Sequence, residues 1–194
     1  MLEEILNSKP RVRILQLLIT RPDWIFSESE ISRELEIAKA TIYRNIKPLV
    51  DYNVIRRFKK GKSVVYQINE KNYLVKELLK PLFLKEVRLP IEAAEDFCKQ
   101  VEGLIKIGIV FGSAAQGKMK PMSDIDLALV TDVPDELESK VDKLKTEFLN
   151  GRGIIISTHI LDSKNFKKRV EAKDPYIIEI TNGKVVFGDL EEVL

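Results

Sequence analysis

One stretch, residues 105–130, constrains the fold of this chain more than any other part of the sequence. An apolar run at residues 105–111 leads to a Gly-Ser pair, Gly112 and Ser113, and an Asp-Ile-Asp triplet at residues 124–126 leads to a second apolar run. Apolar, β-branched runs of this length predict buried strands, and the Gly-Ser pair predicts a tight turn that opens a helix. We therefore expect two strands of one sheet with polar residues at their ends.

The polar residues of this stretch indicate an anion site beside a cation site. A helix that begins after a glycine turn offers unpaired backbone N–H groups and the positive end of its dipole, and both favour phosphate. Side chains alternate along a strand, so Asp124 and Asp126 share one face. Two neighbouring carboxylates repel each other, and a divalent cation such as Mg²⁺ relieves the repulsion. The alternative is that Asp124 caps a turn and Asp126 is solvated.

This combination resembles the nucleotidyltransferases related to DNA polymerase β, and among them the minimal nucleotidyltransferase domains common in prokaryotes. The residues that carry the resemblance are Gly112, Ser113, Gly117, Ser123, Asp124 and Asp126. The resemblance implies a mixed sheet with flanking helices and transfer of a nucleoside monophosphate from an NTP, with ATP expected. It implies that Asp124 and Asp126 are the catalytic residues and ligate two Mg²⁺ ions. The nucleotide-binding residues it implies are Gly112, Ser113, Gly117, Lys118 and Ser123.

Two features depart from the pattern of that family. Ala114 stands where members usually carry a basic residue, which leaves Lys118 and Lys120 as the nearby cations. Most active members also have a third carboxylate on a later strand, and the strand expected here, residues 154–161, contains no acid.

Three polar residues on that strand or directly after it are candidates to take the place of the third carboxylate. Asp162 follows the strand directly, and Ser157 and His159 share one of its faces. For His159, the only histidine in the chain, the alternative is a structural side chain that is hydrogen-bonded within the fold.

The competing function for the whole chain is a DNA-binding regulator whose nucleotidyltransferase domain only senses nucleotide.

The N-terminal part predicts a different fold. Residues 9–69 contain three short segments with helical spacing of apolar residues, followed by a β-hairpin, which is the order of a winged helix-turn-helix. Ser27 and Glu30 predict a capping box at the start of the second helix. The third helix is expected at residues 38–50, where Pro48 should kink or shorten it.

Cations on the third helix and on the hairpin predict binding to double-stranded DNA. Small and basic side chains suit contacts with base edges and phosphates in the major groove, and a basic hairpin suits the phosphate backbone. The alternative is a solvated surface with ordinary lysines. The expected DNA-binding residues are Lys39, Thr41, Tyr43, Arg44 and Lys47 on the helix, and Arg57, Lys59, Lys60 and Lys62 on the hairpin.

The distribution of charge supports two domains. Residues 1–87 carry 17 Lys and Arg against 11 Asp and Glu, whereas residues 88–194 carry 15 against 19. A basic domain attracts nucleic acid and an acidic one does not, so we expect the acceptor to be a protein or a small molecule. The expected fold is α/β (α+β) with two domains. A winged helix-turn-helix occupies residues 1–70, a helical linker interrupted at Pro90 occupies residues 71–103, and a nucleotidyltransferase domain occupies residues 104–194.

Absent features indicate the compartment. Cys98 is the only cysteine, which excludes an intrachain disulfide. The sequence has no signal peptide, no apolar run long enough to span a bilayer and no zinc-binding spacing, so we expect a soluble cytoplasmic protein with no membrane partner. Analogy with winged-helix proteins implies a homodimer. The resemblance to minimal nucleotidyltransferases implies an antitoxin-like role with a small helical toxin as partner.

Overall fold

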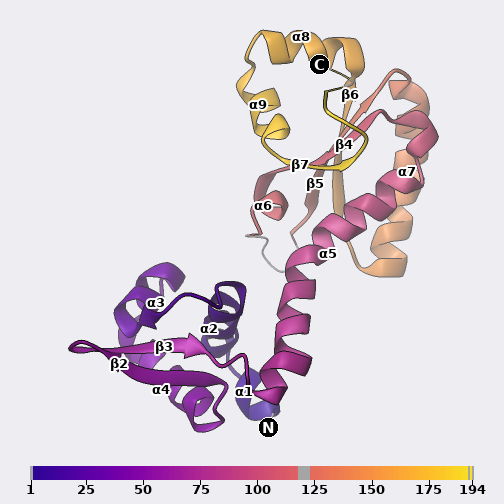
Figure 1. Cartoon of the computed structure of the whole chain (residues 1–194). Helices are drawn as coiled ribbons and strands as arrows, with labels where there is room; N and C mark the ends of the chain where they lie inside the picture. Colours follow the sequence, from indigo (N-terminus) through magenta and orange to yellow (C-terminus); the bar gives the residue numbers. More distant parts are fainter. Residues whose placement is uncertain (1, 118–122, 192, 194) are drawn as a thin grey trace. The chain divides into compact units, whose positions relative to one another are not determined.

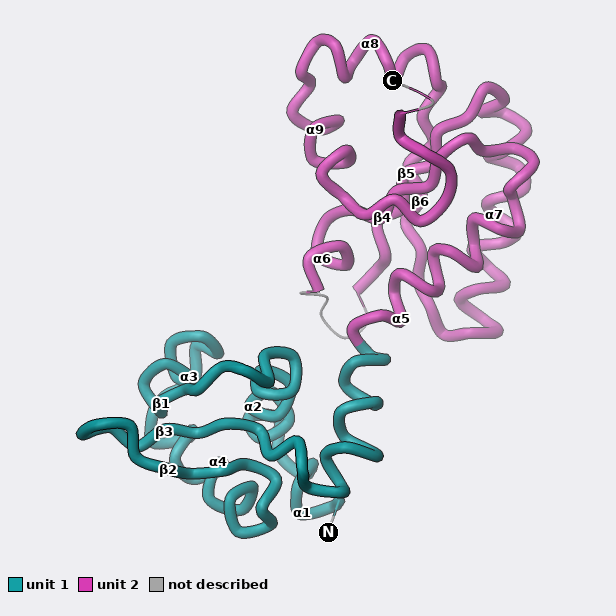
Figure 2. The backbone as a smooth tube through the Cα atoms, viewed as in Figure 1, with its two compact units in different colours: residues 1–86 teal, residues 87–194 magenta. Residues whose placement is uncertain are grey.

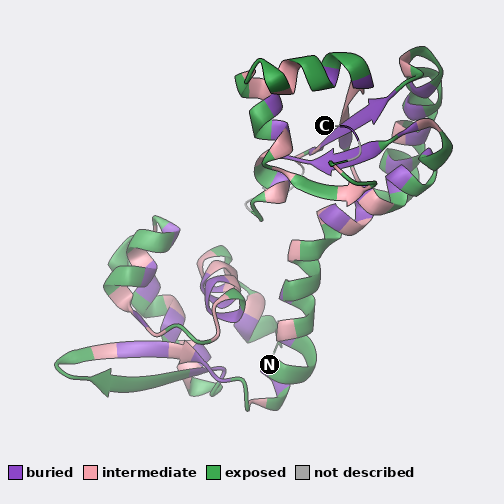
Figure 3. Ribbon diagram, turned by 45° about the horizontal axis from the view of Figure 1, so that its top comes forward, coloured by how far each residue is buried: buried purple, intermediate pink, exposed green. Residues whose placement is uncertain are grey.

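The computed structural model describes residues 2–117, 123–191 and 193. The chain forms two compact units, residues 1–86 and residues 87–194 (Figure 2). The boundary falls within helix α5 (Lys80–Lys99). Each unit has buried apolar clusters of its own, and Figure 3 shows these buried residues on the inner faces of the helices and on the central strands of the second unit.

The first unit is a winged helix-turn-helix, as the sequence predicts (Figure 1). Its strands form an antiparallel sheet in the order β1-β3-β2, with the β2–β3 hairpin as the wing. The elements are α1 (Leu2–Leu6), α2 (Lys9–Thr20), β1 (Phe26–Ser27), α3 (Glu28–Leu35), α4 (Lys39–Asp51), β2 (Ile55–Lys60), β3 (Ser63–Ile68) and η1 (Val75–Leu79), a π-helical turn that leads into α5.

Capping residues explain where the helices of this unit begin. The Ser27 side chain accepts a hydrogen bond from the Glu30 backbone, and the Glu30 carboxylate accepts one from the Ser27 backbone, which confirms the predicted capping box. Ser8 caps α2 and donates its hydroxyl proton to Asn45 of α4 at 2.6 Å. This bond fixes the helix expected to contact DNA against the first helix of the motif. Helix α4 continues through Pro48 to Asp51, so the proline does not shorten it.

The second unit is a mixed four-stranded sheet with the order β6-β5-β4-β7. Strand β5 is parallel to β6 and antiparallel to β4, and β7 is antiparallel to β4. Pro90 lies inside α5, so the expected break of the linker at this proline does not occur. The remaining elements are η2 (Glu102–Leu104), β4 (Ile107–Val110), α6 (Gly112–Ala115), β5 (Ile125–Thr131), α7 (Pro134–Arg152), β6 (Ile156–Asp162), α8 (Ser163–Glu171), α9 (Pro175–Thr181) and β7 (Lys184–Phe187).

Helices cover both faces of this sheet (Figure 1). Helices α5 and α7 pack on one face, where the rings of Phe97 and Phe148 meet edge to face at 5.1 Å. Helices α8 and α9 cover the other face through Phe166 and Ile177. The predicted mixed sheet with flanking helices is therefore confirmed.

Helix α5 lies unusually close to strand β4 at Cys98. A Cβ atom built on Gly108 of β4 would lie 2.4 Å from the Cys98 sulfur, so only glycine fits there without a shift. Burial raises the pKa of the Cys98 thiol to about 12. The thiol is therefore a packed, protonated group and not a nucleophile. Within the described part of the chain, no helix is both long and apolar enough to cross a lipid bilayer.

Candidate functional site

The Gly-Ser pair and the Asp-Ile-Asp triplet meet at one end of the central strands. Strand β4 ends at Val110, and the Phe111 backbone N–H donates to the Asp126 carbonyl at 3.0 Å. This bond brings the turn after β4 beside the start of β5. Gly112 follows with φ +64°, in the left-handed region that favours glycine.

The Asp126 carboxylate lies directly against the backbone of Gly112. A Cβ atom on Gly112 would lie 2.7 Å from Asp126 Oδ2, which is closer than non-bonded atoms approach. Two independent constraints therefore require glycine at this position, the positive φ and the contact with the carboxylate. One oxygen of Asp126 therefore lies against the backbone of the turn.

The two aspartates have different surroundings. Asp124 is exposed and immediately precedes β5, whereas Asp126 is half-buried within it. Burial raises the pKa of the Asp126 carboxyl, the negative charge of Asp124 raises it further, His159 opposes the rise, and Glu179 of α9 adds to it. A carboxylate in this position gains stability when a cation binds beside it.

This arrangement fits Mg²⁺ bound together with a nucleotide. Across residues 2–117, 123–191 and 193, no group of three His, Cys, Asp or Glu side chains forms a metal site by itself. Mg²⁺ is usually held by one or two carboxylates, several waters and the phosphates of a substrate, and not by a cage of protein ligands. Asp124 and Asp126 supply the two hard oxygen donors that such a site needs.

Two of the other predicted nucleotide-binding residues, Ser113 and Gly117, follow the turn along the chain. Ser113 is exposed on α6, which has only four residues, and Gly117 follows it with φ +64°. Ser123 is half-buried next to Asp124. Lys118 and Lys120 lie outside the described residues.

Strand β6 lies parallel to β5 and fixes the places of the three candidates for a third polar group. Asp126 is paired with Ser157 and Ala128 with His159, so both candidates lie on the Asp126 face. Asp162 is paired with Thr131, at the far end of β5. Its carboxylate accepts the Asn165 N–H at 3.0 Å and caps α8. The alternative that Asp162 replaces the third carboxylate is therefore wrong.

His159 has a defined environment that the sequence did not reveal. Its Nδ1 atom is hydrogen-bonded to the Tyr176 hydroxyl of α9 at 2.7 Å, and its ring lies edge to face on Phe111 at 5.1 Å. The Nε2 atom is buried, has no hydrogen-bond partner among the residues that the structure describes, and lies 3.9 Å from Asp126 Oδ1. Tyr176 is 17 residues from His159 in the sequence, and no periodicity connects the two.

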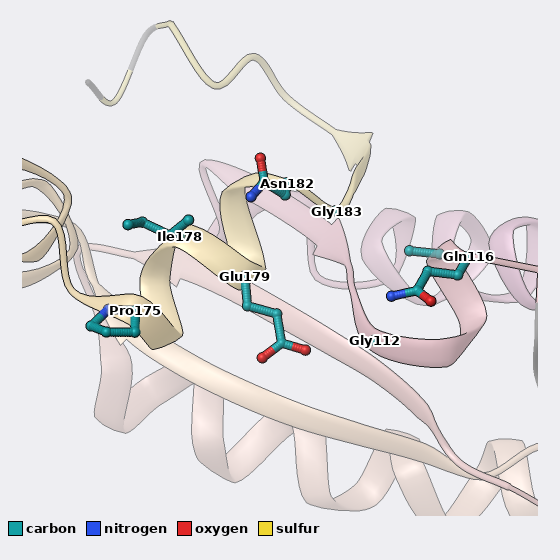
Figure 4. A pocket seen from close by; sticks show the side chains of 8 residues that line it. Gly112, Gln116, Pro175, Ile178, Glu179, Asn182 and Gly183 are labelled. Carbon is teal, nitrogen blue, oxygen red and sulfur yellow. The ribbon is translucent and has the colours of Figure 1, made fainter.

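A pocket of about 370 Å³ borders the turn (Figure 4). Figure 4 shows the side chains of Glu179 and Gln116 projecting into the space between α9 and α6. No signal in the sequence indicates Glu179. The family pattern leads one to expect a further acid on the strand after β5, whereas Glu179 belongs to helix α9. The lining residues are Gly112, Ala115, Gln116, Pro175, Ile178, Glu179, Asn182 and Gly183.

The predicted DNA-binding residues of α4 form its outward side. Ile42, Ile46 and Leu49 are buried under the helix. Tyr43 is 61% exposed, which is far more than a tyrosine that packs in a core. Thr41 is half-buried, and the exposed residues with it are Lys39, Tyr43, Arg44 and Lys47.

The wing presents the remaining predicted cations. Beyond Ile55, every residue of β2 is exposed (Figure 3). Arg57 is paired with Tyr66 across the hairpin, whereas Lys59 and Lys60 are paired with residues nearer the tip and Lys62 lies in the turn. In the described part of the chain these lysines form no salt bridge within 4.0 Å of an acidic group, so their charge is available to a ligand.

The chain is similar to one protein family over part of its second unit and to several solved structures. Residues 91–185 match a family model described as nucleotidyltransferase domain. Similar solved structures include reduced HlyU from Vibrio cholerae N16961, with 20% identity, 45% of this chain and 83% of that chain covered, and a TM-score of 0.37. They also include the transcriptional regulator BldR from Sulfolobus solfataricus, with 19% identity, 53% and 76% covered, and a TM-score of 0.34. No curated protein matches the chain.

The family match covers the strands and the turn from which the candidate site is built. It begins within α5 and ends within β7, and it includes Gly112, Asp124 and Asp126. Residues 91–185 are therefore similar to a nucleotidyltransferase domain, and a winged helix-turn-helix precedes them in the same chain.

Proposed function

We propose that this chain is a Mg²⁺-dependent nucleotidyltransferase that transfers a nucleoside monophosphate from an NTP, with ATP expected, to a protein or small-molecule acceptor. Its winged helix-turn-helix binds double-stranded DNA. The observation that carries the proposal is the contact between the Asp126 carboxylate and Gly112, with Asp124 beside it. The matching nucleotidyltransferase domain supports it.

Each residue of the site has a chemical role in this proposal. The Gly112–Ser113 backbone and the Ser113 hydroxyl donate hydrogen bonds to the terminal phosphates, and Lys118 adds positive charge. Asp124 and Asp126 hold two Mg²⁺ ions, which supply charge neutralisation for an in-line transfer. In that transfer the acceptor oxygen bonds to the α-phosphorus and pyrophosphate leaves.

The pocket beside the turn receives a part of the substrates that carries no phosphate. The negative charge of Glu179 repels a phosphate, whereas the amides of Gln116 and Asn182 provide both donors and acceptors. Pro175 and Ile178 add apolar surface. Such a mixture suits the nucleoside or the acceptor.

Labelled ATP tests the transferase proposal. The wild-type protein, Mg²⁺, α-labelled ATP and lysate should give label on an acceptor, and the Asp124→Asn/Asp126→Asn variant should give none. Asp142→Asn is a matched control, because Asp142 is exposed on α7 in the same unit. Absence of metal-dependent label from every acceptor, despite measurable nucleotide binding, would reject the enzyme in favour of the second candidate.

The second candidate is a DNA-binding regulator whose nucleotidyltransferase domain only senses nucleotide. It is favoured by β6, which places Ser157 and His159, and no acid, on the face of Asp126. This candidate predicts that Mg²⁺-ATP changes the affinity for DNA although no label is transferred.

Assembly belongs to the same proposal. A homodimer would present two recognition helices to two half-sites of an operator. Sedimentation of the full chain, alone and with a small helical protein encoded beside it, tests both the dimer and the toxin partner. A monomer that binds neither a second copy nor that protein would exclude both.

A further inference from the structure

The imidazole of His159 has one satisfied nitrogen and one that is buried without a partner. Nδ1 is hydrogen-bonded to the Tyr176 hydroxyl at 2.7 Å, whereas Nε2 has no hydrogen-bond partner among the residues that the structure describes. Buried polar atoms are almost always hydrogen-bonded, so an exception calls for an explanation. Asp126 Oδ1 lies 3.9 Å from Nε2.

The neighbours of the two ring nitrogens favour one tautomer of His159. A tyrosine hydroxyl can donate or accept, and a neutral imidazole has one donor and one acceptor nitrogen. If the hydroxyl accepted from Nδ1, the bare lone pair of Nε2 would face the negative Asp126, which is repulsive. If the hydroxyl donates to Nδ1, Nε2 carries the proton and points it at the carboxylate. The second arrangement is favoured electrostatically.

The surroundings of Tyr176 support its role as donor. Burial raises the pKa of the Tyr176 hydroxyl above its ordinary value, although Arg169 opposes this, so the hydroxyl keeps its proton at neutral pH. Arg169 lies 5.7 Å from the centre of the tyrosine ring and is paired with Asp174 at 3.0 Å. The Asp174 side chain accepts the Tyr176 N–H at 2.9 Å and so fixes the start of α9.

The two oxygens of Asp126 consequently have different neighbours. Oδ2 lies against Gly112, at the turn proposed to hold phosphates, and Oδ1 faces Nε2 of His159. A separation of 3.9 Å exceeds a hydrogen bond. Hydrogen bonds in sites without substrate are often long and shorten when the substrate binds.

We propose that Tyr176 and His159 form a positioning pair, in which the Tyr176 hydroxyl fixes the Nε2–H tautomer of His159 and this N–H orients the carboxylate of Asp126. The role of the pair in holding Asp126 for Mg²⁺ and nucleotide rests on the proposed transferase function. The tautomer itself does not. Partners behind metal ligands typically change metal affinity or activity by about 10- to 100-fold when they are removed.

Nuclear magnetic resonance tests the pair without any enzymatic assay. His159 is the only histidine of the chain, so a long-range ¹H–¹⁵N spectrum of the full-length protein contains a single imidazole. At pH 8 we expect the Nε2–H tautomer. Tyr176→Phe should produce a mixture of tautomers, and Asp126→Asn should shift the Nε2–H resonance. An Nδ1–H tautomer, or resonances that neither variant changes, would overturn the proposal.

Conservative and disruptive variants then test the consequence for the site. His159→Gln can place an amide N–H near the position of Nε2, whereas His159→Leu has no donor. We expect His159→Leu to weaken Mn²⁺ binding in the presence of ATP by about 10-fold or more, and His159→Gln to retain most of the affinity. Equal losses in two variants with wild-type melting temperatures would show that the imidazole only fills space. If the wild type bound no Mn²⁺-ATP at all, the transferase proposal would fail, and the tautomer experiment would still decide for or against the pair.

Discussion

The carboxylate of Asp126 and the backbone of Gly112 are in such close contact that a methyl group on Gly112 would lie 2.7 Å from Oδ2. The contact joins the turn that follows β4 to Asp126, the second residue of the neighbouring strand β5. It also places a negative charge beside the turn that is proposed to hold phosphates, an arrangement that a bound cation would stabilise.

Gly112→Ala should remove nucleotide binding more completely than it lowers stability. The alanine methyl group must displace the Asp126 carboxylate. The backbone at residue 112 must also keep a φ of +64°, and this left-handed conformation alone costs an alanine roughly 1–2 kcal/mol. Calorimetry with Mg²⁺-ATP and a urea titration measure the two effects. Gly151→Ala is a suitable control, because its Cβ would have no neighbour within 4 Å. Unchanged ATP affinity in Gly112→Ala would contradict the proposed phosphate site.

Asp126→Asn should stabilise the free protein while it removes metal binding. Because burial and Asp124 raise the pKa of Asp126 in the folded state, the folded protein binds this proton more tightly than the unfolded chain does. Stability from this group is therefore full below the unfolded pKa, near 3.8, and is lost as the pH rises through the folded pKa. Without Mg²⁺, the variant should melt at a higher temperature than the wild type at pH 7, and the difference should vanish towards pH 3. A lower melting temperature at pH 7 would show that the folded state favours the ionised carboxylate.

Removing the wing lysines should weaken DNA binding and make the affinity for DNA less dependent on the salt concentration. Each phosphate contact that is lost should reduce the slope of log affinity against log salt by about 0.9, so Lys59→Ala/Lys60→Ala/Lys62→Ala should flatten it by up to about 2.7. The matched control is Lys164→Ala/Lys167→Ala/Lys168→Ala, which removes the same charge from exposed positions of α8. Equal slopes for the two triple variants would mean that the wing does not contact DNA. Arg44→Ala should weaken binding further if α4 enters the major groove.

Gly108→Ala should destabilise the second unit through a clash with Cys98. The added methyl group would lie 2.4 Å from the sulfur, and overpacking of this kind costs about 1–3 kcal/mol in the free energy of unfolding. The double variant Gly108→Ala/Cys98→Ala removes the sulfur and should recover a large part of that loss. Denaturant titrations of the single and double variants measure this coupling. If the losses of unfolding free energy from the two substitutions simply add in the double variant, the clash does not involve the Cys98 sulfur.

Local signals in the sequence predicted much of the fold. The capping box at Ser27 and the apolar runs around Gly112 depend on neighbouring residues, and the structure contains the helix and the strands that they predict. The two prolines do not end their helices. Each removes one helical hydrogen bond, but the carbonyls left free belong to the exposed Arg44 and Glu86, which water can satisfy. Helices α4 and α5 therefore continue through Pro48 and Pro90.

The candidate site was only partly predictable, because half of its surroundings come from α9. Gly112, Asp124 and Asp126 are recognisable from their spacing along adjoining strands. Tyr176 and Glu179 reach the site only because α9 folds back over the sheet, and no local pattern encodes that contact. Asp162, at the end of β6, was a candidate because most active members of the family carry a third carboxylate on a later strand. In this chain Asp162 caps α8.

A crystal structure with Mg²⁺ and a non-hydrolysable ATP analogue tests the central claim most directly. The proposed function predicts phosphates on the Gly112–Ser113 backbone and Mg²⁺ bound to oxygens of both Asp124 and Asp126. A nucleotide bound elsewhere, or carboxylates turned away from each other and from the metal, would contradict it.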